Sequence, residues 1–182
     1  MLVADAQKEM RTVFAGGFWG QLVSSVIWLV SAALGTWVTP RAAILQLVLC
    51  GFFIFPATQL LLRLSSGPVS LSRGNPLGQL GMQIAFTLPM TMLLLAPVTA
   101  FRLNWFFPAL MVLLGAHYLP FTFLYGMRLF ILLCAILVGG GVVIAEYFSA
   151  SFSTGGWVAG LTLFLFAWIG RASVRTIPHA KE

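Results

Sequence analysis

Six long apolar runs, separated by short polar segments, set the pattern of this 182-residue chain. Each run is close to the ~20 residues that a helix needs to cross the hydrocarbon core of a bilayer. The runs lack the polar alternation of barrel strands, and in lipid only helices and closed barrels satisfy their backbone polar groups. The pattern therefore predicts an all-α polytopic membrane protein with six transmembrane helices, at residues 14–38, 42–62, 78–99, 105–125, 128–148 and 155–171.

The connections between these runs are short, apart from a turn-rich stretch of Ser, Gly, Asn and Pro at residues 63–77. We therefore expect one domain over residues 1–182. Ahead of the first run, residues 2–13 place their apolar positions near one side of a helix, with charged positions between them. This spacing favours a short interfacial helix, and a frayed terminus is the alternative. The apolar positions are Leu2, Val3, Ala6, Met10 and Val13.

The composition excludes a water-soluble fold. The chain is 60% hydrophobic and 8% charged, with a mean hydropathy of +0.99, whereas ordinary globular domains contain about 25% charged residues. The net charge is +6, but the basic residues are scattered singly and form no patch of the kind that binds nucleic acid. The lipid bilayer is therefore the expected partner, and the basic residues act as topology signals.

These basic residues predict the orientation of the chain, because cytoplasmic loops of membrane proteins accumulate Lys and Arg. With the N-terminus in the cytoplasm, eight of the ten Lys and Arg residues lie on the cytoplasmic side, and only Arg41 and Arg102 lie outside. We therefore expect both termini in the cytoplasm and the protein in the inner (plasma) membrane. The eight cytoplasmic residues are Lys8, Arg11, Arg63, Arg73, Arg128, Arg171, Arg175 and Lys181.

Polar side chains recur along one face of the first, third and fourth predicted helices. From the helical rise of about 1.5 Å per residue, Gln21, Gln83 and His117 all lie roughly 9–12 Å from the cytoplasmic ends of their helices. Two interpretations remain open: these faces line a polar cavity, or they hydrogen-bond neighbouring helices as packing contacts. The cavity interpretation gives a candidate site for substrate binding or proton relay that comprises His117, Gln83, Gln21, Tyr118, Ser24 and Thr87.

His117 is the most informative of these residues, because an ionisable group at membrane depth is costly and marks a functional pathway by default. Its neutral imidazole both donates and accepts hydrogen bonds, so it could relay a proton or hold a substrate. A neutral histidine that only bridges helices is the alternative. No second His or Cys stands at a metal-ligand spacing from it, and Cys50 and Cys134 are expected at different depths, so neither a metal site nor a disulfide is expected.

Glu146 is the one acidic residue inside a predicted span, near the outer end of the fifth helix. A carboxylate at this position would be stabilised by Arg102 or Arg41, which are expected on the same side of the membrane. An outer structural ion pair of Glu146 with Arg102 is therefore the preferred interpretation. A role in binding a coupling ion or a substrate is the alternative.

Prolines and glycines inside the predicted helices favour a transport function. Prolines interrupt the second, third and fourth runs, and broken helices often surround transport sites. Three consecutive glycines in the fifth run indicate close helix contact or a hinge. The prolines are Pro56, Pro89, Pro97, Pro108 and Pro120, and the glycines are Gly139, Gly140 and Gly141.

The favoured function is a small transporter, channel or solute-binding protein for a small polar or amphipathic solute. One alternative is an intramembrane lipid- or peptide-modifying enzyme, for which Ser24 or Ser25 with His117 would be the nucleophile and base. A structural or assembly role is another. The chain carries no phosphate-binding loop and no dinucleotide fingerprint, so no cofactor is expected. Small-residue helix faces favour homo-oligomers.

Two blocks carry a family resemblance: Arg73-Gly-Asn-Pro-Leu-Gly, at the start of the third run, and Gly115-Ala-His-Tyr-Leu-Pro-Phe121, in the fourth. With these blocks, the chain resembles an uncharacterised family of small multi-pass bacterial membrane proteins. The resemblance covers most of the chain. It implies an inner-membrane helical bundle and carries over no functional residues.

Overall fold

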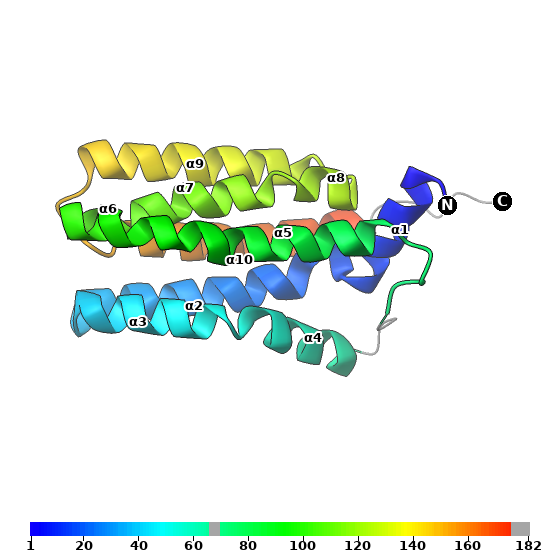
Figure 1. Cartoon of the computed structure of the whole chain (residues 1–182), viewed down its shortest axis with the longest axis horizontal. Helices are drawn as coiled ribbons and strands as arrows, with labels where there is room; N and C mark the ends of the chain where they lie inside the picture. The colour runs from blue at the N-terminus through cyan, green and yellow to red at the C-terminus, as the bar shows by residue number, and fades with distance from the viewer. Residues whose placement is uncertain (66–69, 176–182) are drawn as a thin grey trace.

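The computed structural model describes residues 1–65 and 70–175, and these residues contain helices and no strand. The all-α prediction is therefore confirmed (Figure 1). Residues 66–69 of the predicted loop, and Lys181 at the C-terminus, lie outside the described residues. The helices are α1 (Val3–Val13), α2 (Phe18–Trp37), α3 (Pro40–Gly51), α4 (Ile54–Leu64), α5 (Leu77–Thr91), α6 (Leu95–Phe101), α7 (Phe106–Tyr118), α8 (Phe121–Tyr125), α9 (Leu129–Tyr147) and α10 (Thr154–Arg175).

Five helical segments among the described residues are long and apolar enough to cross a membrane, and the bent pair α3 and α4 makes a sixth if it counts as one span. Many large apolar side chains on these segments are exposed, among them Phe86, Leu93 and Leu132, as lipid-facing positions require. The chain is therefore an integral membrane protein. Its five long segments are Ala15–Trp37, Leu77–Phe101, Leu103–Tyr125, Leu129–Tyr147 and Thr154–Val174, within a few residues of the predicted spans.

The second span is not the continuous helix that the apolar run suggested. α3 ends at Gly51, α4 begins at Ile54, and the two helices meet at an angle of 54°. Pro56 lies in the first turn of α4, where its ring excludes the carbonyl four residues earlier and its nitrogen donates no hydrogen bond. Proline therefore breaks this span, and the third and fourth spans also change helix type or direction near Pro89 and Pro120.

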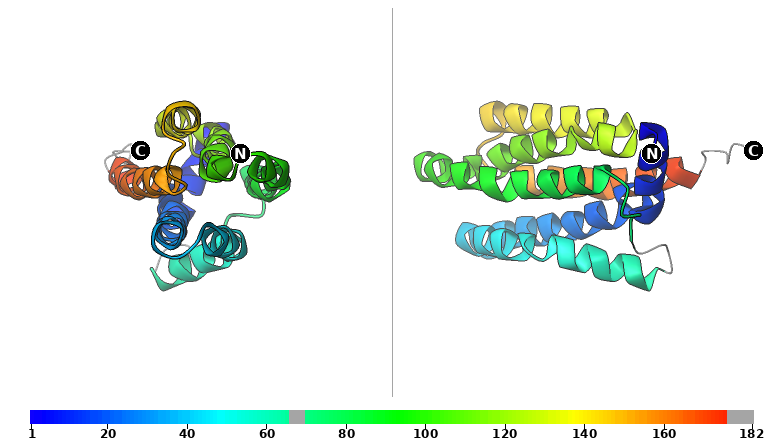
Figure 2. Two further views of the ribbon diagram at one scale, coloured as in Figure 1. Left: turned by 90° about the vertical axis from the view of Figure 1, so that its left-hand side faces the viewer. Right: turned by 45° about the vertical axis from the view of Figure 1, so that its right-hand side comes forward.

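α2 packs against α10, α7 packs against α9, and α10 joins the two pairs; α3 and α4 pack beside α2, and α5 and α6 beside α7 (Figure 2). Glycines allow close approach within both pairs, because a Cβ on Gly160 of α10 would lie 2.7 Å from the Leu29 side chain of α2. A Cβ on Gly115 of α7 would likewise lie 2.8 Å from the side chain of Val138 on α9. Leu77–Phe101 is the least buried of the five long segments.

α1 crosses one end of the bundle instead of continuing the first span (Figure 2). The link to α2 consists of Ala15, Gly16 and Gly17, which all have positive φ angles, a conformation that glycine adopts without steric cost. α1 packs against α5 and α8, and Ala6, Met10 and Val13 are its buried residues. Leu2 and Val3, on the expected apolar side, are exposed.

The two ends of the described chain lie at the same end of the bundle. A Cβ on Gly16 would lie 2.6 Å from the Val174 side chain of α10, so the last turn of α10 is adjacent to the link between α1 and α2 (Figure 1). This arrangement requires an even number of crossings. The bent pair α3 and α4 therefore counts as one crossing, in agreement with the six predicted spans.

Candidate functional site

Four of the six predicted site residues form a continuous polar track across three helices. The Thr87 hydroxyl of α5 lies 3.1 Å from Nδ1 of His117 on α7. The rings of His117 and Tyr118 are 5.7 Å apart, edge to face. Tyr118 makes a side-chain polar contact with Ser24 of α2. We call these four residues the polar track, and their contacts place them at one level of the bundle.

Burial increases along the polar track. Thr87 is exposed on α5 and His117 is half-buried, whereas Tyr118 and Ser24 are each only 6% exposed. The track therefore leads from an exposed face of α5 into the interior between α7 and α2. The sequence pattern placed His117 at the depth of Gln21 and Gln83, which lie one turn from the track, and it did not indicate this direction.

The two predicted glutamines lie one helical turn from the polar track, toward the end where α1 lies, and they differ in environment. Gln21 of α2 is 3% exposed, and its Oε1 has no hydrogen-bond partner among the described residues. A buried acceptor without a partner carries a desolvation cost, so it indicates a site for a donor. Gln83 is instead exposed on α5.

An aromatic cluster lies beside the polar track, between α8 and α9 and the end of α7. Phe121 has ring-centre distances of 5.4 Å to His117, 5.5 Å to Tyr118 and 5.6 Å to Phe130. Tyr125 stacks on Phe130 at 5.5 Å. Sequence reasoning missed Phe121 and Phe130. The spacing of Tyr118, Phe121 and Tyr125 by three and four residues was the available signal for Phe121, whereas Phe130 belongs to another helix and gave none.

The structure does not bring a serine nucleophile to the histidine. The Ser25 hydroxyl donates to the Leu22 carbonyl at 2.7 Å within α2, and Ser24 meets Tyr118. The side-chain partner of His117 is Thr87. Among the described residues there is no cluster of three or more His, Cys, Asp or Glu side chains that could hold a metal ion, and Cys50 and Cys134 are free thiols.

At the end of the bundle that α1 crosses, polar contacts join α1 to the segment before α5 and to the end of α8. The Glu9 carboxylate accepts hydrogen bonds from the Ser72 backbone N–H at 2.6 Å and from the Asn75 amide at 2.8 Å. On the other side, Arg11 donates to the carbonyl of Tyr125 at the end of α8. A Cβ on Gly81 of α5 would lie 3.7 Å from the side chains of both Met10 and Leu124. α1 therefore contacts the N-terminal half of α5, which precedes Thr87.

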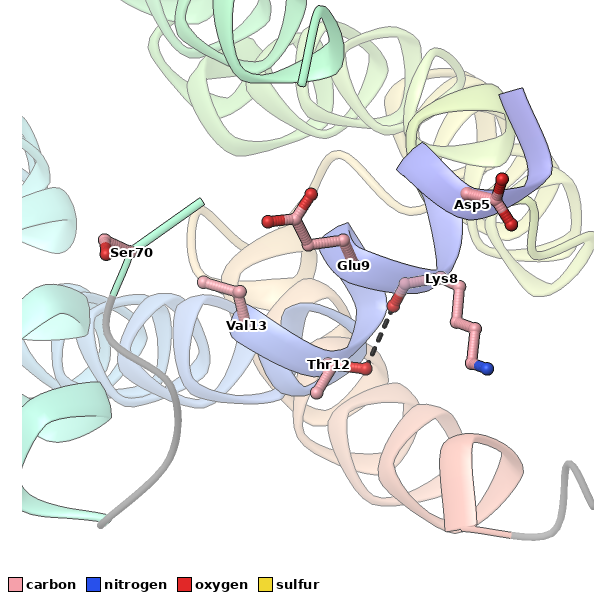
Figure 3. A pocket seen from close by; sticks show the side chains of 6 residues that line it. All are labelled: Asp5, Lys8, Glu9, Thr12, Val13 and Ser70. Atoms are coloured by element: carbon pink, nitrogen blue, oxygen red, sulfur yellow. Dashed lines mark hydrogen bonds between the residues drawn. The ribbon is translucent and has the colours of Figure 1, made fainter. Parts of the chain in front are cut away.

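A hollow of about 330 Å³ lies between α1 and the segment that follows α4 (Figure 3). Glu9 and Ser70 line it, together with the side of α1 that carries Asp5 and Lys8. The Ser72 backbone N–H, followed by the Asn75 amide, lowers the pKa of the Glu9 carboxyl from its ordinary value of 4.5. The charged form of Glu9 is therefore the form that holds α1 against this segment.

The model of a family of unknown function, DUF7010, matches residues 3–172. The chain belongs to this family. The match runs from the start of α1 into the last turns of α10, so the fastened α1 and the polar track both lie within the matched residues. It confirms the resemblance to an uncharacterised family. No curated protein and no solved structure matches the chain.

The Glu9 contact predicts that the attachment of α1 in this DUF7010 protein depends on pH. Because its folded pKa lies below 4.5, the stabilisation is present above that value and is lost as the pH falls through the folded pKa. We expect acid to increase hydrogen exchange of residues 3–13 relative to intrinsic rates. Glu9→Gln should abolish this pH dependence, and Asp5→Asn, the same charge change one turn earlier, should keep it. An unchanged profile in Glu9→Gln would contradict the assignment.

At the opposite end of the bundle, the two residues of the predicted ion pair both lie near one indole, that of Trp105. The Cζ atom of Arg102 lies 5.1 Å from the centre of the Trp105 ring. The Trp105 Nε1–H donates to the Ala145 carbonyl at 3.2 Å, next to Glu146. Arg102 and Glu146 are both exposed. Their direct pairing stays a prediction.

Proposed function

We propose that this protein is a small transporter, channel or solute-binding protein, which holds a small polar or amphipathic solute at the polar track. The buried, unpartnered Oε1 of Gln21, one turn from Ser24, is the observation that carries the proposal. A solute that donates a hydrogen bond to this oxygen would satisfy it. Tyr118 and Ser24 supply hydroxyl groups that both donate and accept hydrogen bonds, so they can bind either a donor or an acceptor group of the solute.

His117 has a separate role in this proposal. It lies between exposed Thr87 and buried Tyr118, and a histidine at membrane depth can exchange a proton with a solute or with water. The Thr87 hydroxyl donates to the Ile84 carbonyl at 2.7 Å, so its oxygen can accept from Nδ1. A protonated His117 would keep this contact and gain a second donor at Nε2. Proton coupling is therefore assigned to His117 and solute contact to Gln21, Ser24 and Tyr118.

Motion in this proposal is assigned to α5 and α6. This segment is the least buried of the five long ones and packs mainly against α7, α8 and α1. It also carries Pro89 and a 3₁₀ turn at Met92–Leu94, where the regular backbone hydrogen bonds are interrupted. A shift of α5 relative to α7 would separate Thr87 from His117 and open the polar track.

We further propose that the end carrying α1 faces the cytoplasm, that the protein lies in the inner membrane of a bacterium, and that residues 1–182 form one domain. The support for the orientation is the distribution of Lys and Arg, eight of ten on this side by the prediction from sequence. The polar track would then open from the cytoplasmic half of the membrane, with α1 as a short interfacial helix at its mouth.

Cysteine accessibility tests the proposed site. In a background with Cys50→Ala and Cys134→Ala, we expect Ser24→Cys and Thr87→Cys to react with a small, membrane-impermeant methanethiosulfonate in lipid vesicles. Ser31→Cys is the matched control, because Ser31 is a fully buried serine on the same helix that donates to the Ala43 carbonyl away from the polar track.

The rates of Ser24→Cys and Ser31→Cys decide between a site and a packing contact. A rate for Ser24→Cys at least about tenfold above that of Ser31→Cys supports a hydrated site, and protection by an added solute identifies the solute. Equal and slow rates at both positions would mean that the polar track only joins helices, and the proposed function would fail. Faster labelling in inside-out than in right-side-out vesicles supports the cytoplasmic opening.

A further inference from the structure

A narrow apolar groove lies between α7 and α9, at the end of the bundle opposite α1. Its volume is about 150 Å³, and it is lined by Trp105 and by residues of α7 and α9. Gly141 of α9 and Ala109 and Val112 of α7 line its floor, where α7 and α9 lie close together. Among the described residues that line it, Glu146 is the one charged group.

Trp105, which lines this groove, links it to two side chains of opposite charge. Glu146 lines the groove together with Trp105, and Arg102 lies over the same Trp105 ring, with its Cζ atom 5.1 Å from the ring centre. The hydrogen bond from Trp105 Nε1 to the Ala145 carbonyl fixes the indole against α9. Tryptophan at a helix end is typical of the headgroup level of a membrane.

We propose that this groove is a binding site for a zwitterionic phospholipid with an ethanolamine headgroup. Part of an acyl chain lies in the apolar groove between α7 and α9. The phosphate pairs with the Arg102 guanidinium, and the ammonium donates hydrogen bonds to the Glu146 carboxylate. Both are charge-assisted hydrogen bonds, which are the stronger kind.

The arrangement of charges selects this lipid class. An anionic phospholipid would satisfy Arg102 but would bring no cation to Glu146. A choline headgroup carries the cation but no N–H group to donate to the carboxylate. Ethanolamine has the cation and the donors, so it matches both side chains at once. The site is independent of the polar track, which lies toward the other end of the bundle.

The test compares lipids in purified protein. We expect phosphatidylethanolamine, added to the protein in detergent micelles, to raise the melting temperature more than phosphatidylglycerol with the same acyl chains, since a ligand that binds the folded state stabilises it. Glu146→Gln should reduce the preference for phosphatidylethanolamine about tenfold in apparent affinity, the size expected for loss of one charge-assisted hydrogen bond. Asp5→Asn, a carboxylate lost from the opposite end, should keep the preference.

Two further measurements separate the contribution of the apolar groove from that of the charged side chains. Ala109→Leu fills the groove without changing charge and should weaken binding of both lipids, and phosphoethanolamine without acyl chains should give no stabilisation. Equal stabilisation by the two lipids in the wild-type protein would overturn the proposal. So would equal losses of melting temperature for Glu146→Gln and Arg102→Gln that do not depend on lipid, because that result indicates a direct ion pair.

Discussion

Replacing Gly141 with alanine is expected to lower the free energy of unfolding by about 1–3 kcal/mol, the usual cost of overpacking a well-packed contact. A Cβ on Gly141 would lie 2.7 Å from the backbone carbonyl oxygen of Pro108 and 3.0 Å from the side chain of Val112. Because the closest atom belongs to the backbone of α7, it cannot rotate away as a side chain would. α7 and α9 must move apart, and unfolding of the purified protein in micelles by heat or by denaturing detergent measures the loss.

Gly139→Ala is the matched control for this prediction. Gly139 lies on the same helix, two residues earlier, and a Cβ on it would have no described atom of another helix within 4 Å. Alanine there should be neutral or stabilising by up to ~1 kcal/mol, because alanine favours helix more than glycine does. Similar destabilisation by both variants would indicate that the three glycines act together as a hinge, and that the close contact of α7 with α9 is not what Gly141 provides.

The positions of the membrane-spanning segments could be predicted because they depend on local properties of the chain. Length and hydropathy define a span whatever its neighbours are, and the observed segments Leu129–Tyr147 and Thr154–Val174 agree with the predicted 128–148 and 155–171 within three residues. The bend between α3 and α4 was the main departure. Pro56 marked it in the sequence, but a proline can also be accommodated in a continuous membrane helix.

Which helices meet could not be predicted, because a helical period shows which residues share a face but not what that face contacts. Gln83 and Thr87 lie on one stripe of α5 and both are exposed, and yet of the two it is Thr87 that contacts His117. The reason is the peripheral place of α5, which meets α7 along a short part of its length. Gln21 shows the opposite outcome, since α2 packs against α10, α3 and α4 and Gln21 is buried.

The position of α1 also depended on information outside its own segment. Its apolar spacing predicted a helix, but Leu2 and Val3 were expected on the apolar side together with Met10 and are exposed. The positive φ angles of Ala15 and its two following glycines turn α1 across the bundle, and its partners come from the segment before α5 and from α8. No pattern within residues 2–13 indicated those partners.

Asn75 is expected to be the polar side chain whose loss destabilises the protein most. It is 7% exposed, its amide donates to the Ala6 carbonyl at 3.1 Å and to the Glu9 carboxylate, and its Oδ1 accepts from the Leu77 backbone N–H at 2.9 Å. Asn75→Ala removes all three hydrogen bonds and leaves the Ala6 carbonyl buried without this donor. At about 0.5–1.5 kcal/mol for each bond, and more for the charged partner, the expected loss is roughly 2–4 kcal/mol.

Two variants give this expectation its controls. Asn104→Ala removes an asparagine at the other end of the bundle, where the amide donates to the Ser149 carbonyl at 2.8 Å, and should cost about 1 kcal/mol. Asn75→Asp keeps the acceptor for Leu77 but places a second carboxylate beside Glu9, so it should destabilise more at neutral pH than in acid. The measurements are the free energy of unfolding and hydrogen exchange across residues 3–13.

The result also bears on access to the polar track, because α1 lies beneath the end of α5 that leads to Thr87. If α1 covers this approach, Asn75→Ala should speed the labelling of a cysteine at Thr87 as well as the exchange of α1, whereas Asn104→Ala should change neither. Faster hydrogen exchange of α1 with unchanged labelling at Thr87 would mean that α1 stabilises the bundle and does not cover the polar track. A loss in Asn75→Ala no larger than that in Asn104→Ala would show that the contacts of Arg11 and the buried Met10 hold α1 without Asn75.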